Sequence, residues 1–326
     1  MSSVSEIANR KLWLDSLRGM AMILVVYGHC VSGWTEYFVF TSPIKMPLFF
    51  AISGYLFKLR DGNTLEFLKS LFRKIVVPWL VLGLLPFVFI QSPLEVWDRF
   101  LGMLSGKIHW FMICLILAEC LHFVVHKCLK EEKYLVGLSL MMTTAGYIMH
   151  CYGLGKYAMF NTALIVQSFF CLGHLIKVYE AKLSLRASQW LPAVGLGYLT
   201  LCVLSLWLFP AQSLDVHLNR YYNLPLCALL IISGVFFTFT LFRLLDIKHS
   251  WIVFIGQNTL LIYMLHFGIL KLINHYCGFL SAFHIYPISI LGLAKSTLAI
   301  FICCIIAFAV NRYIPEIVGK QRTKKV

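Results

Sequence analysis

The sequence predicts an all-α protein, a bundle of about ten membrane-spanning helices. Hydrophobic residues make up 60% of its 326 residues, and only 13% are charged. Several uncharged apolar runs are about 20 residues long, enough for a helix to cross about 30 Å of hydrocarbon. Because lipid offers the backbone no hydrogen-bond partners, such runs are stable in it only as helices. The segments between the runs are too short for a soluble domain, so we expect one integral-membrane domain over residues 1–326.

The apolar runs give the expected spans in order along the chain. They lie at about 13–32, 44–58, 75–91, 108–126, 134–150, 157–177, 188–209, 224–243, 251–270 and 287–311, before a basic tail at 312–326. With the N-terminus in the cytoplasm, 21 of the 28 Lys and Arg fall at inner ends and loops, 6 fall at outer ones, and Lys295 lies inside the last span. This positive-inside distribution puts both termini in the cytoplasm. The net charge of +14 therefore indicates orientation and contact with anionic lipid, not nucleic acid.

Two concentrations of basic residues stand out. One inner loop holds Lys58, Arg60, Lys69, Arg73 and Lys74, and the tail holds Arg312, Lys320, Arg322, Lys324 and Lys325. Within the loop, Asp61 to Lys74 is expected to be an amphipathic surface helix with Leu65, Leu68 and Phe72 toward lipid.

Two kinds of signal are missing from the sequence. Residues 1–12 lack an apolar region followed by small residues, so no cleavable signal peptide is expected. The eleven cysteines, Cys277 among them, form no C-x-x-C pair, so neither a metal site nor a disulfide framework is indicated.

The first span carries a polar stripe. Asp15, Arg18 and His29 are spaced three and eleven residues apart, which puts them on one helical face. At 1.5 Å rise per residue, Asp15 and His29 are about 21 Å apart along the axis, so Asp15 does not orient His29. Arg18 suits a phosphate, and His29 suits proton movement near neutral pH. The structural alternatives are an arginine that extends to the headgroups and a histidine that is only packed and hydrogen-bonded.

Other spans hold polar groups with similar alternatives. Ser53-Gly54 allows a neighbouring helix to approach closely, and Glu119 lies near mid-membrane, where it is costly unless paired or facing water. Thr259, Tyr263 and His266 share one face of the ninth span, with His266 at the depth of His29. Two such histidines could line one cavity or clamp a haem, although haem clamps usually need two such pairs.

The outer segment Asp215–Asn223 mixes hydrogen-bonding groups with tyrosines. Such a mixture is typical of a sugar-binding surface, and equally of interfacial anchoring.

These segments together resemble the acyltransferase 3 family of bacterial integral-membrane acyltransferases. In particular, they resemble its stand-alone members that O-acetylate sugars, which are related to fucose 4-O-acetylase. The matching pieces run in order from Trp13 to about Arg312: D15-S-L-R18-G19 with His29, M46-P-L-F-F-A-I-S-G-Y55, K69-S-L-F-R73-K74, the W110-F pair with Glu119, F169-F-C-L-G173, and I255-G-Q-N-T-L-L-I-Y263-M-L-H266.

The resemblance implies transfer of an acetyl group from cytoplasmic acetyl-CoA to a hydroxyl of a surface glycan such as O-antigen, capsule or exopolysaccharide, in the bacterial inner membrane. His29 and Arg18 match the family's essential histidine and arginine; the Ser53 region and Arg73 match positions that its members share. Two departures are His174, where a tyrosine is common, and the lack of the extracytoplasmic hydrolase-like domain that some relatives carry after the last span.

The expected mechanism divides the stripe into a donor end and a reaction end. Asp15 and Arg18 lie at the donor end, where CoA phosphates bind Arg18, Arg73, Lys69 and Lys74, with Ser53 beside the donor. His29 is the general base on the acceptor hydroxyl or the nucleophile that carries the acyl group. The expected cavity lining is Glu119, Trp110, Asn258, Tyr263 and His266; acetyl-CoA is a co-substrate and no metal is expected.

Two other functions fit the same features. A transporter or flippase of a lipid-linked sugar would use the stripe as a path, and a sensor or assembly subunit would use it only to hold helices together. Labelled acetyl-CoA separates the first from an enzyme, because only an enzyme leaves an ester on the acceptor.

Overall fold

The computed structural model describes residues 11–31, 35–58, 64–88, 92–129, 131–184, 187–276 and 290–320. Outside these ranges lie several residues singled out above: Arg60 and Asp61 of the basic loop, Cys277, and Arg322, Lys324 and Lys325 of the tail. The described residues form helices joined by short turns, and their only bridge between extended residues pairs Asp215 with Arg220.

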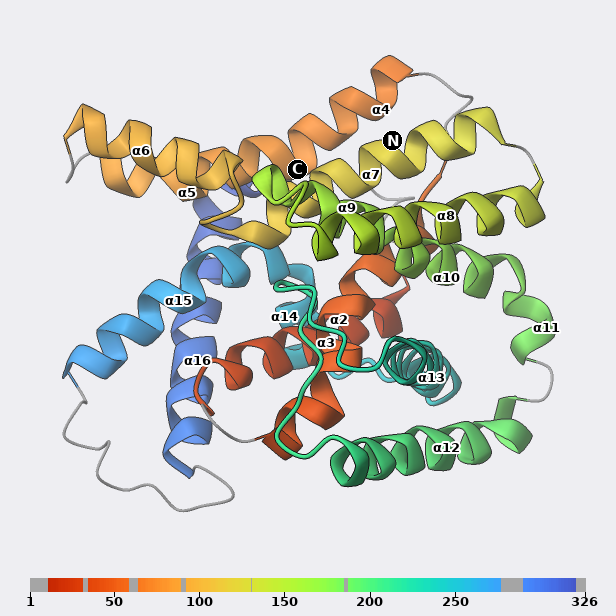
Figure 1. The fold of residues 1–326 in the computed structure, drawn as a ribbon. Coiled ribbons are helices and arrows are strands. Elements are labelled where there is room, and N and C mark those ends of the chain that lie inside the picture. The colour runs from red at the N-terminus through yellow and green to blue at the C-terminus, as the bar shows by residue number, and fades with distance from the viewer. Residues whose placement is uncertain are drawn as a thin grey trace, which may run out of the picture. The chain divides into compact units, whose positions relative to one another are not determined.

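The chain divides into two compact units, which are described separately. Unit 1 comprises residues 1–49, 179–212 and 223–304, and unit 2 comprises residues 50–178, 213–222 and 305–326. Figure 1 shows the helices in chain order by colour.

Unit 1 holds α2 (Leu12–Gly28), the first part of α3 (Thr35–Leu56), α11 (Glu180–Ser184), α12 (Ala187–Leu208), α13 (Leu224–Leu244), α14 (Ser250–Gln257), α15 (Thr259–Tyr276) and most of α16 (Ile290–Tyr313). Helix α2 packs against α13, α14 and α15, and α12 packs against α13. Leu17, Ala21 and Val26 of α2 have no exposed surface, so α2 is the core helix of this unit.

Two glycines allow α2 and α14 to cross in backbone contact. A Cβ added to Gly19 would lie 2.2 Å from the carbonyl oxygen of Ile252, and one added to Gly256 would lie 1.7 Å from that of Asp15. Any side chain at either position would therefore force these helices apart.

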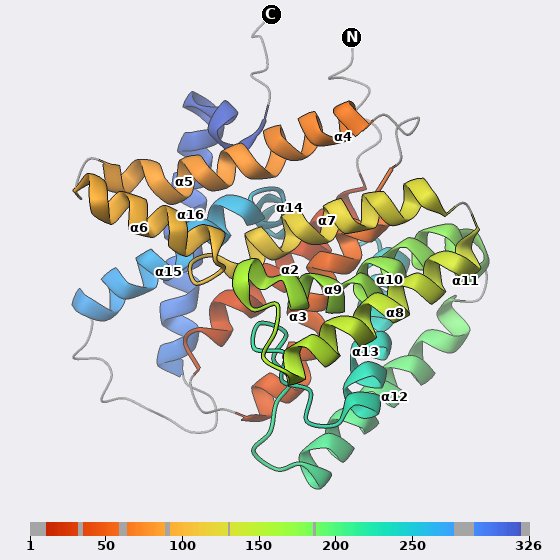
Figure 2. The same cartoon turned by 45° about the horizontal axis from the view of Figure 1, so that its top comes forward.

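Unit 2 holds the end of α3, α4 (Thr64–Leu71), a π-helical turn (Phe72–Val76), α5 (Val77–Val88), α6 (Pro93–Leu104), α7 (Trp110–Cys128), α8 (Glu132–Cys151), a 3-10 turn (Tyr157–Met159), α9 (Phe160–Ile165), α10 (Gln167–Val178), the end of α16 and a second 3-10 turn (Pro315–Val318). Figure 2 shows α8 alongside α9 and α10, in agreement with their contacts.

The close helix approach predicted at Ser53-Gly54 is confirmed, and its partner is α10. A Cβ on Gly54 would lie 2.0 Å from the carbonyl oxygen of Phe170, and one on Gly173 would lie 1.8 Å from that of Ala51. Two segments that are far apart in the sequence thus meet through a glycine from each.

The all-helical membrane architecture is confirmed, whereas the count of ten spans and the cytoplasmic placement of the termini stay predictions. Among the described residues, α3, α7, α12, α13 and α16 are each long and apolar enough to cross a membrane. Two helix pairs are long and apolar enough only when each pair is taken together, and each is bent at a break, by 43° between Tyr157–Ile165 and Gln167–Val178 and by 85° between α14 and α15. The expected continuous helices at 157–177 and 251–270 are therefore wrong in detail.

Two boundaries also differ from expectation. Helix α2 ends at Gly28, so that His29 is its C-cap instead of an interior residue of a span reaching 32. Within the expected surface helix, Leu65 and Leu68 are exposed on α4, and Phe72 is exposed on the π-helical turn that follows. The segment 91–107, expected as a loop, contains α6, which Ser92 and Glu95 start with a capping box.

Candidate active site

The N-terminal end of α2 carries a buried carboxylate with two polar partners. Asp15 is 4% exposed, and its Oδ1 lies 4.0 Å from Nη1 of Arg18. The side-chain amide of Gln257, at the end of α14, donates to Asp15 Oδ2 at 3.3 Å. The Arg18 side chain keeps 28% of its surface exposed. The Arg18 side chain therefore lies beside the Asp15 carboxylate and is partly accessible.

The other end of α2 brings His29 next to His266. His29 is exposed, His266 is 3% exposed, and their ring centroids lie 5.3 Å apart. Nδ1 of His266 lies 2.8 Å from the carbonyl oxygen of Tyr263 and 3.1 Å from that of Ile262. Because a carbonyl only accepts, Nδ1 carries the proton and Nε2 of neutral His266 is an acceptor.

Of two further predicted residues of the ninth span, Tyr263 contacts this pair and Asn258 lies at the helix break. Tyr263 is half-buried, and its ring centroid lies 5.9 Å from that of His266. Asn258 is 4% exposed at the break between α14 and α15, where its amide donates to the carbonyl oxygen of Phe254 at 2.8 Å. Asn258 thus satisfies backbone at the bend, which is a structural role.

The predicted donor-binding cations lie on unit 2. Lys69 near the end of α4, and Arg73 and Lys74 on the π-helical turn, are all exposed. Ser53 is half-buried at the α3–α10 crossing. Three cations within six residues on an exposed surface suit a polyphosphate ligand.

Trp110 and Glu119, the remaining predicted lining residues, lie on α7 of unit 2. Trp110 stacks on His217 with 4.7 Å between ring centroids and 19° between planes. The loop that carries His217 is folded: Asp215 Oδ1 accepts from the backbone N–H of His217 at 2.8 Å, and Asn219 donates to Thr162 Oγ1 at 2.8 Å. Desolvation lowers the pKa of His217, and the Asp215 carboxylate partly opposes that shift. Glu119 is half-buried.

One polar cluster escaped the sequence analysis. His122 and His126 lie 4.6 Å apart on α7, and His174 of α10 lies 4.6 Å from His126, all as ring-centroid distances. Phe57 packs on the first two. His122 is fully buried, and neither of its ring nitrogens has a hydrogen-bond partner in the part of the chain that the structure describes. The i, i+4 spacing of His122 and His126 could have indicated that these two lie together on one helix face. That His174 joins them follows only from the fold.

These histidines do not make a metal centre. Among the described residues, no three His, Cys, Asp or Glu side chains are placed to hold a metal ion.

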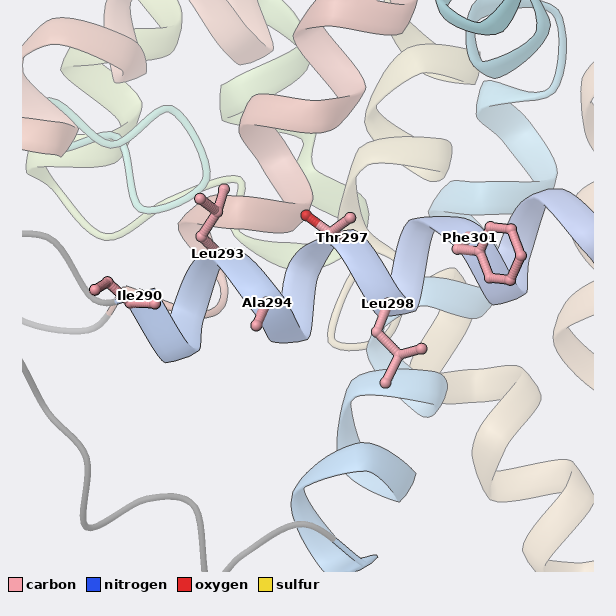
Figure 3. A pocket seen from close by; sticks show the side chains of 6 residues that line it. All are labelled: Ile290, Leu293, Ala294, Thr297, Leu298 and Phe301. Carbon is pink, nitrogen blue, oxygen red and sulfur yellow. The ribbon is translucent and has the colours of Figure 1, made fainter.

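A groove of about 530 Å³ runs along α16 of unit 1. Figure 3 shows its lining residues, all from this one helix: Ile290, Leu293, Ala294, Thr297, Leu298 and Phe301. They contribute one hydroxyl and no charge, so the groove is an apolar helix face of the kind that lipid covers and not a reaction site.

Comparison with known proteins adds one finding. A family model described as an acyltransferase domain matches residues 11–312, nearly the whole chain. No curated protein and no solved structure matches the chain significantly.

Proposed function

The chain belongs to the acyltransferase 3 family, and from that premise we propose that it transfers an acetyl group from cytoplasmic acetyl-CoA to a hydroxyl of a surface glycan. The proposal places it in the bacterial inner membrane, as a multi-pass O-acetyltransferase. The acceptor class comprises O-antigen, capsule and exopolysaccharide.

The observation that carries the proposal is the histidine pair at the end of α2. His29 is exposed, so a substrate can reach it, and it lies 5.3 Å from the buried ring of His266. A neutral imidazole is the side chain best matched to proton transfer near pH 7. Two backbone carbonyls hold His266, which makes it a positioning residue for His29.

Two routes are chemically balanced at His29. As general base, its ring nitrogen takes the acceptor's hydroxyl proton while the oxygen attacks the thioester carbonyl; the C–S bond then breaks, and the CoA thiolate takes up a proton. As nucleophile, the nitrogen attacks first, and CoA leaves as the thiolate, which takes up the proton that the acylated imidazole releases; the hydroxyl oxygen then takes the acetyl group, and its proton returns to the imidazole. Both routes yield an ester and free CoA.

Charged groups of each unit supply the proposed donor contacts. On unit 2, Arg73, Lys69 and Lys74 are assigned to the CoA phosphates, because they are exposed and close in sequence. On unit 1, Arg18 is assigned the same class of contact, and the Asp15 carboxylate lies beside it. Neutral replacement of Arg73 should therefore raise the KM for acetyl-CoA more than it lowers kcat.

The experiment is acetyl transfer by purified protein in lipid nanodiscs, with radiolabelled acetyl-CoA and polysaccharide from cells that lack the gene. Loss of a general base or nucleophile typically costs about 10²-fold or more, so His29→Ala should lose at least that much. His275→Ala is the matched control, because His275 is an exposed histidine on the same helix as His266. Transfer by His29→Ala at the wild-type rate would falsify the proposal, and polysaccharide left without an ester by the wild-type protein would favour a transporter.

A further inference from the structure

The loop between α12 and α13 belongs to unit 2, although both helices belong to unit 1. This loop, residues 213–222, is fixed by buried side chains: Leu214 is 2% exposed, Val216 is 3% exposed and Asn219 is 4% exposed. The amide of Asn219 also donates to Oγ1 of Thr162 on α9 at 2.8 Å. Because these side chains hold the loop in place, its exposed side chains occupy defined positions on unit 2.

Two charged side chains stand next to each other on this loop. Asp215 and Arg220 exchange both backbone hydrogen bonds, at 3.1 and 2.9 Å, so they form an antiparallel pair. The side chains of such a pair leave the backbone on the same side, with Cβ atoms about 4.5–5.5 Å apart. The loop therefore presents a carboxylate, which accepts hydrogen bonds, beside a guanidinium, which donates them.

Both groups keep bonding capacity for a ligand. Oδ1 of Asp215 accepts from the backbone N–H groups of His217 and Leu218, at 2.8 and 3.1 Å, whereas no described residue donates to Oδ2. Arg220 is exposed, and its guanidinium makes no ion pair with a residue that the structure describes. One carboxylate oxygen thus holds the turn while the other oxygen and the guanidinium remain available.

An aromatic ring lies within the same turn. The His217 ring stacks on the Trp110 indole, with 4.7 Å between centroids and 19° between planes. The indole therefore covers one face of the imidazole and supports it. His217 is nevertheless exposed, so the rest of its ring is open to a ligand.

Interfacial anchoring does not explain this arrangement. Aromatic belts at membrane surfaces consist of Trp and Tyr, whereas the exposed ring here is an imidazole and Trp110 is half-buried against it. A pyranose ring has the complementary features, because its C–H groups form an apolar face that packs on an aromatic ring and its hydroxyls both donate and accept. One carboxylate and one guanidinium carry no net charge together, which favours hydroxyls over an anion.

We infer that unit 2 carries a saccharide-binding surface, which binds a pyranose ring of the acceptor glycan through its apolar face and its hydroxyls. The surface is made by Trp110, Asp215, His217 and Arg220. This inference rests on the proposed function and names a recognition site for its acceptor. Every sugar carries hydroxyls that could react at His29, so selection of one glycan requires contacts with parts of it that do not react.

The first experiment measures binding of polysaccharide from cells that lack the gene to the protein in nanodiscs, without acetyl-CoA. Arg220→Gln removes the guanidinium, and Asp215→Asn removes the charge but keeps an oxygen for the turn. A hydrogen bond to a charged group contributes about tenfold or more to binding, so each variant should weaken binding by at least that factor. His217→Ala, which removes the ring, should also weaken it. Lys133→Gln is the control and should bind as the wild type does, because Lys133 is an exposed cation of unit 2 that pairs with Glu131.

A second experiment needs no variant. Diethyl pyrocarbonate modifies accessible imidazoles, and mass spectrometry locates the modified residues. Saturating polysaccharide should protect His217 in the wild type and leave His249, an exposed histidine directly before α14, unprotected. Equal modification of His217 with and without polysaccharide would overturn the inference, even if a loop variant fails to fold.

Transfer kinetics separate this inference from the proposed function. The loop variants should raise the KM for polysaccharide and leave the KM for acetyl-CoA unchanged. Transfer that depends on His29 and keeps the wild-type KM for polysaccharide in every loop variant would refute the surface and leave the proposed function standing. Binding that depends on the loop, without any transfer by the wild type, would support the surface and refute the proposed function.

Discussion

Gly256→Ala tests whether the contact between α2 and α14 sets the geometry of the stripe. The added methyl would lie 1.7 Å from the carbonyl oxygen of Asp15, whereas real Cβ contacts are not closer than 3.0 Å. The two helices would have to separate by about 1.5 Å, since a backbone oxygen cannot rotate away as a side chain does. Overpacking of this kind typically costs about 1–3 kcal/mol of stability.

The same displacement should lower activity through position alone. Helix α2 carries Asp15 and Arg18 at one end and His29 at the other, so a shift of the helix moves all three. A displacement of about 1 Å at reacting groups can cost about 10²-fold in rate. We therefore expect a loss of that order in acetyl transfer per folded molecule.

The assay is thermal unfolding and acetyl transfer in the same nanodisc preparation, with Gly268→Ala as the matched control. Gly268 lies on α15, the other half of the same broken span, and a Cβ there would meet nothing within 4 Å. Alanine is a better helix former than glycine by about 1 kcal/mol, so the control should be slightly stabilised and fully active. If Gly256→Ala behaves like Gly268→Ala in both measurements, the reasoning from this contact fails.

Two further predictions concern histidines of unit 2. His122→Leu should raise the free energy of unfolding by about 1 kcal/mol, because it replaces two buried ring nitrogens that lack partners among the described residues with apolar surface; a loss of stability in denaturant titration would contradict this. For His217, the folded state has the lower pKa, so the unfolded chain binds the proton more readily and stability should fall as pH drops below about 6.5. The unfolding temperature of the wild type should therefore drop more between about pH 7.5 and 5.5 than that of His217→Gln, and equal drops would refute the assignment.

Hydropathy and helical spacing were sufficient to predict most helices of unit 1 and the face that they bury. The runs expected at 188–209 and 224–243 are helices at Ala187–Leu208 and Leu224–Leu244, because a long apolar run has no other stable conformation in lipid. Hydropathy averaged over a whole apolar run does not reveal a break in the helix. Asn258 sits within an apolar run, and its amide satisfies a backbone carbonyl where the helix bends by 85°.

The sequence predicted which residues belong to the candidate site better than it predicted which side chains touch one another there. Periodicity indicates that His29 faces the bundle, and matching depth suggests His266 as its neighbour. Neither indicates that Phe267 packs edge-on against His29 as well, because this contact depends on how α15 turns. His174 illustrates the same limit, since the Gly54–Gly173 crossing places α10 beside the end of α3. Phe57, directly after α3, packs on His126, which in turn contacts His174.

The break at Asn258 explains how one span can serve both ends of α2. Along α14, Ile252 meets Gly19 and Gly256 meets Asp15, so the residue numbers of α14 rise as those of α2 fall. A straight continuation of α14 would move away from His29. Before the bend, Gln257 donates to Asp15 at one end of α2. After the 85° bend, α15 takes a different direction, and His266, nine residues further along the chain, contacts His29. His29 lies about 21 Å from Asp15 along α2. The two ends of α2, proposed as the donor end and the reaction end, are thus both contacted by the pair α14 and α15, and a displacement at Gly256 should affect both.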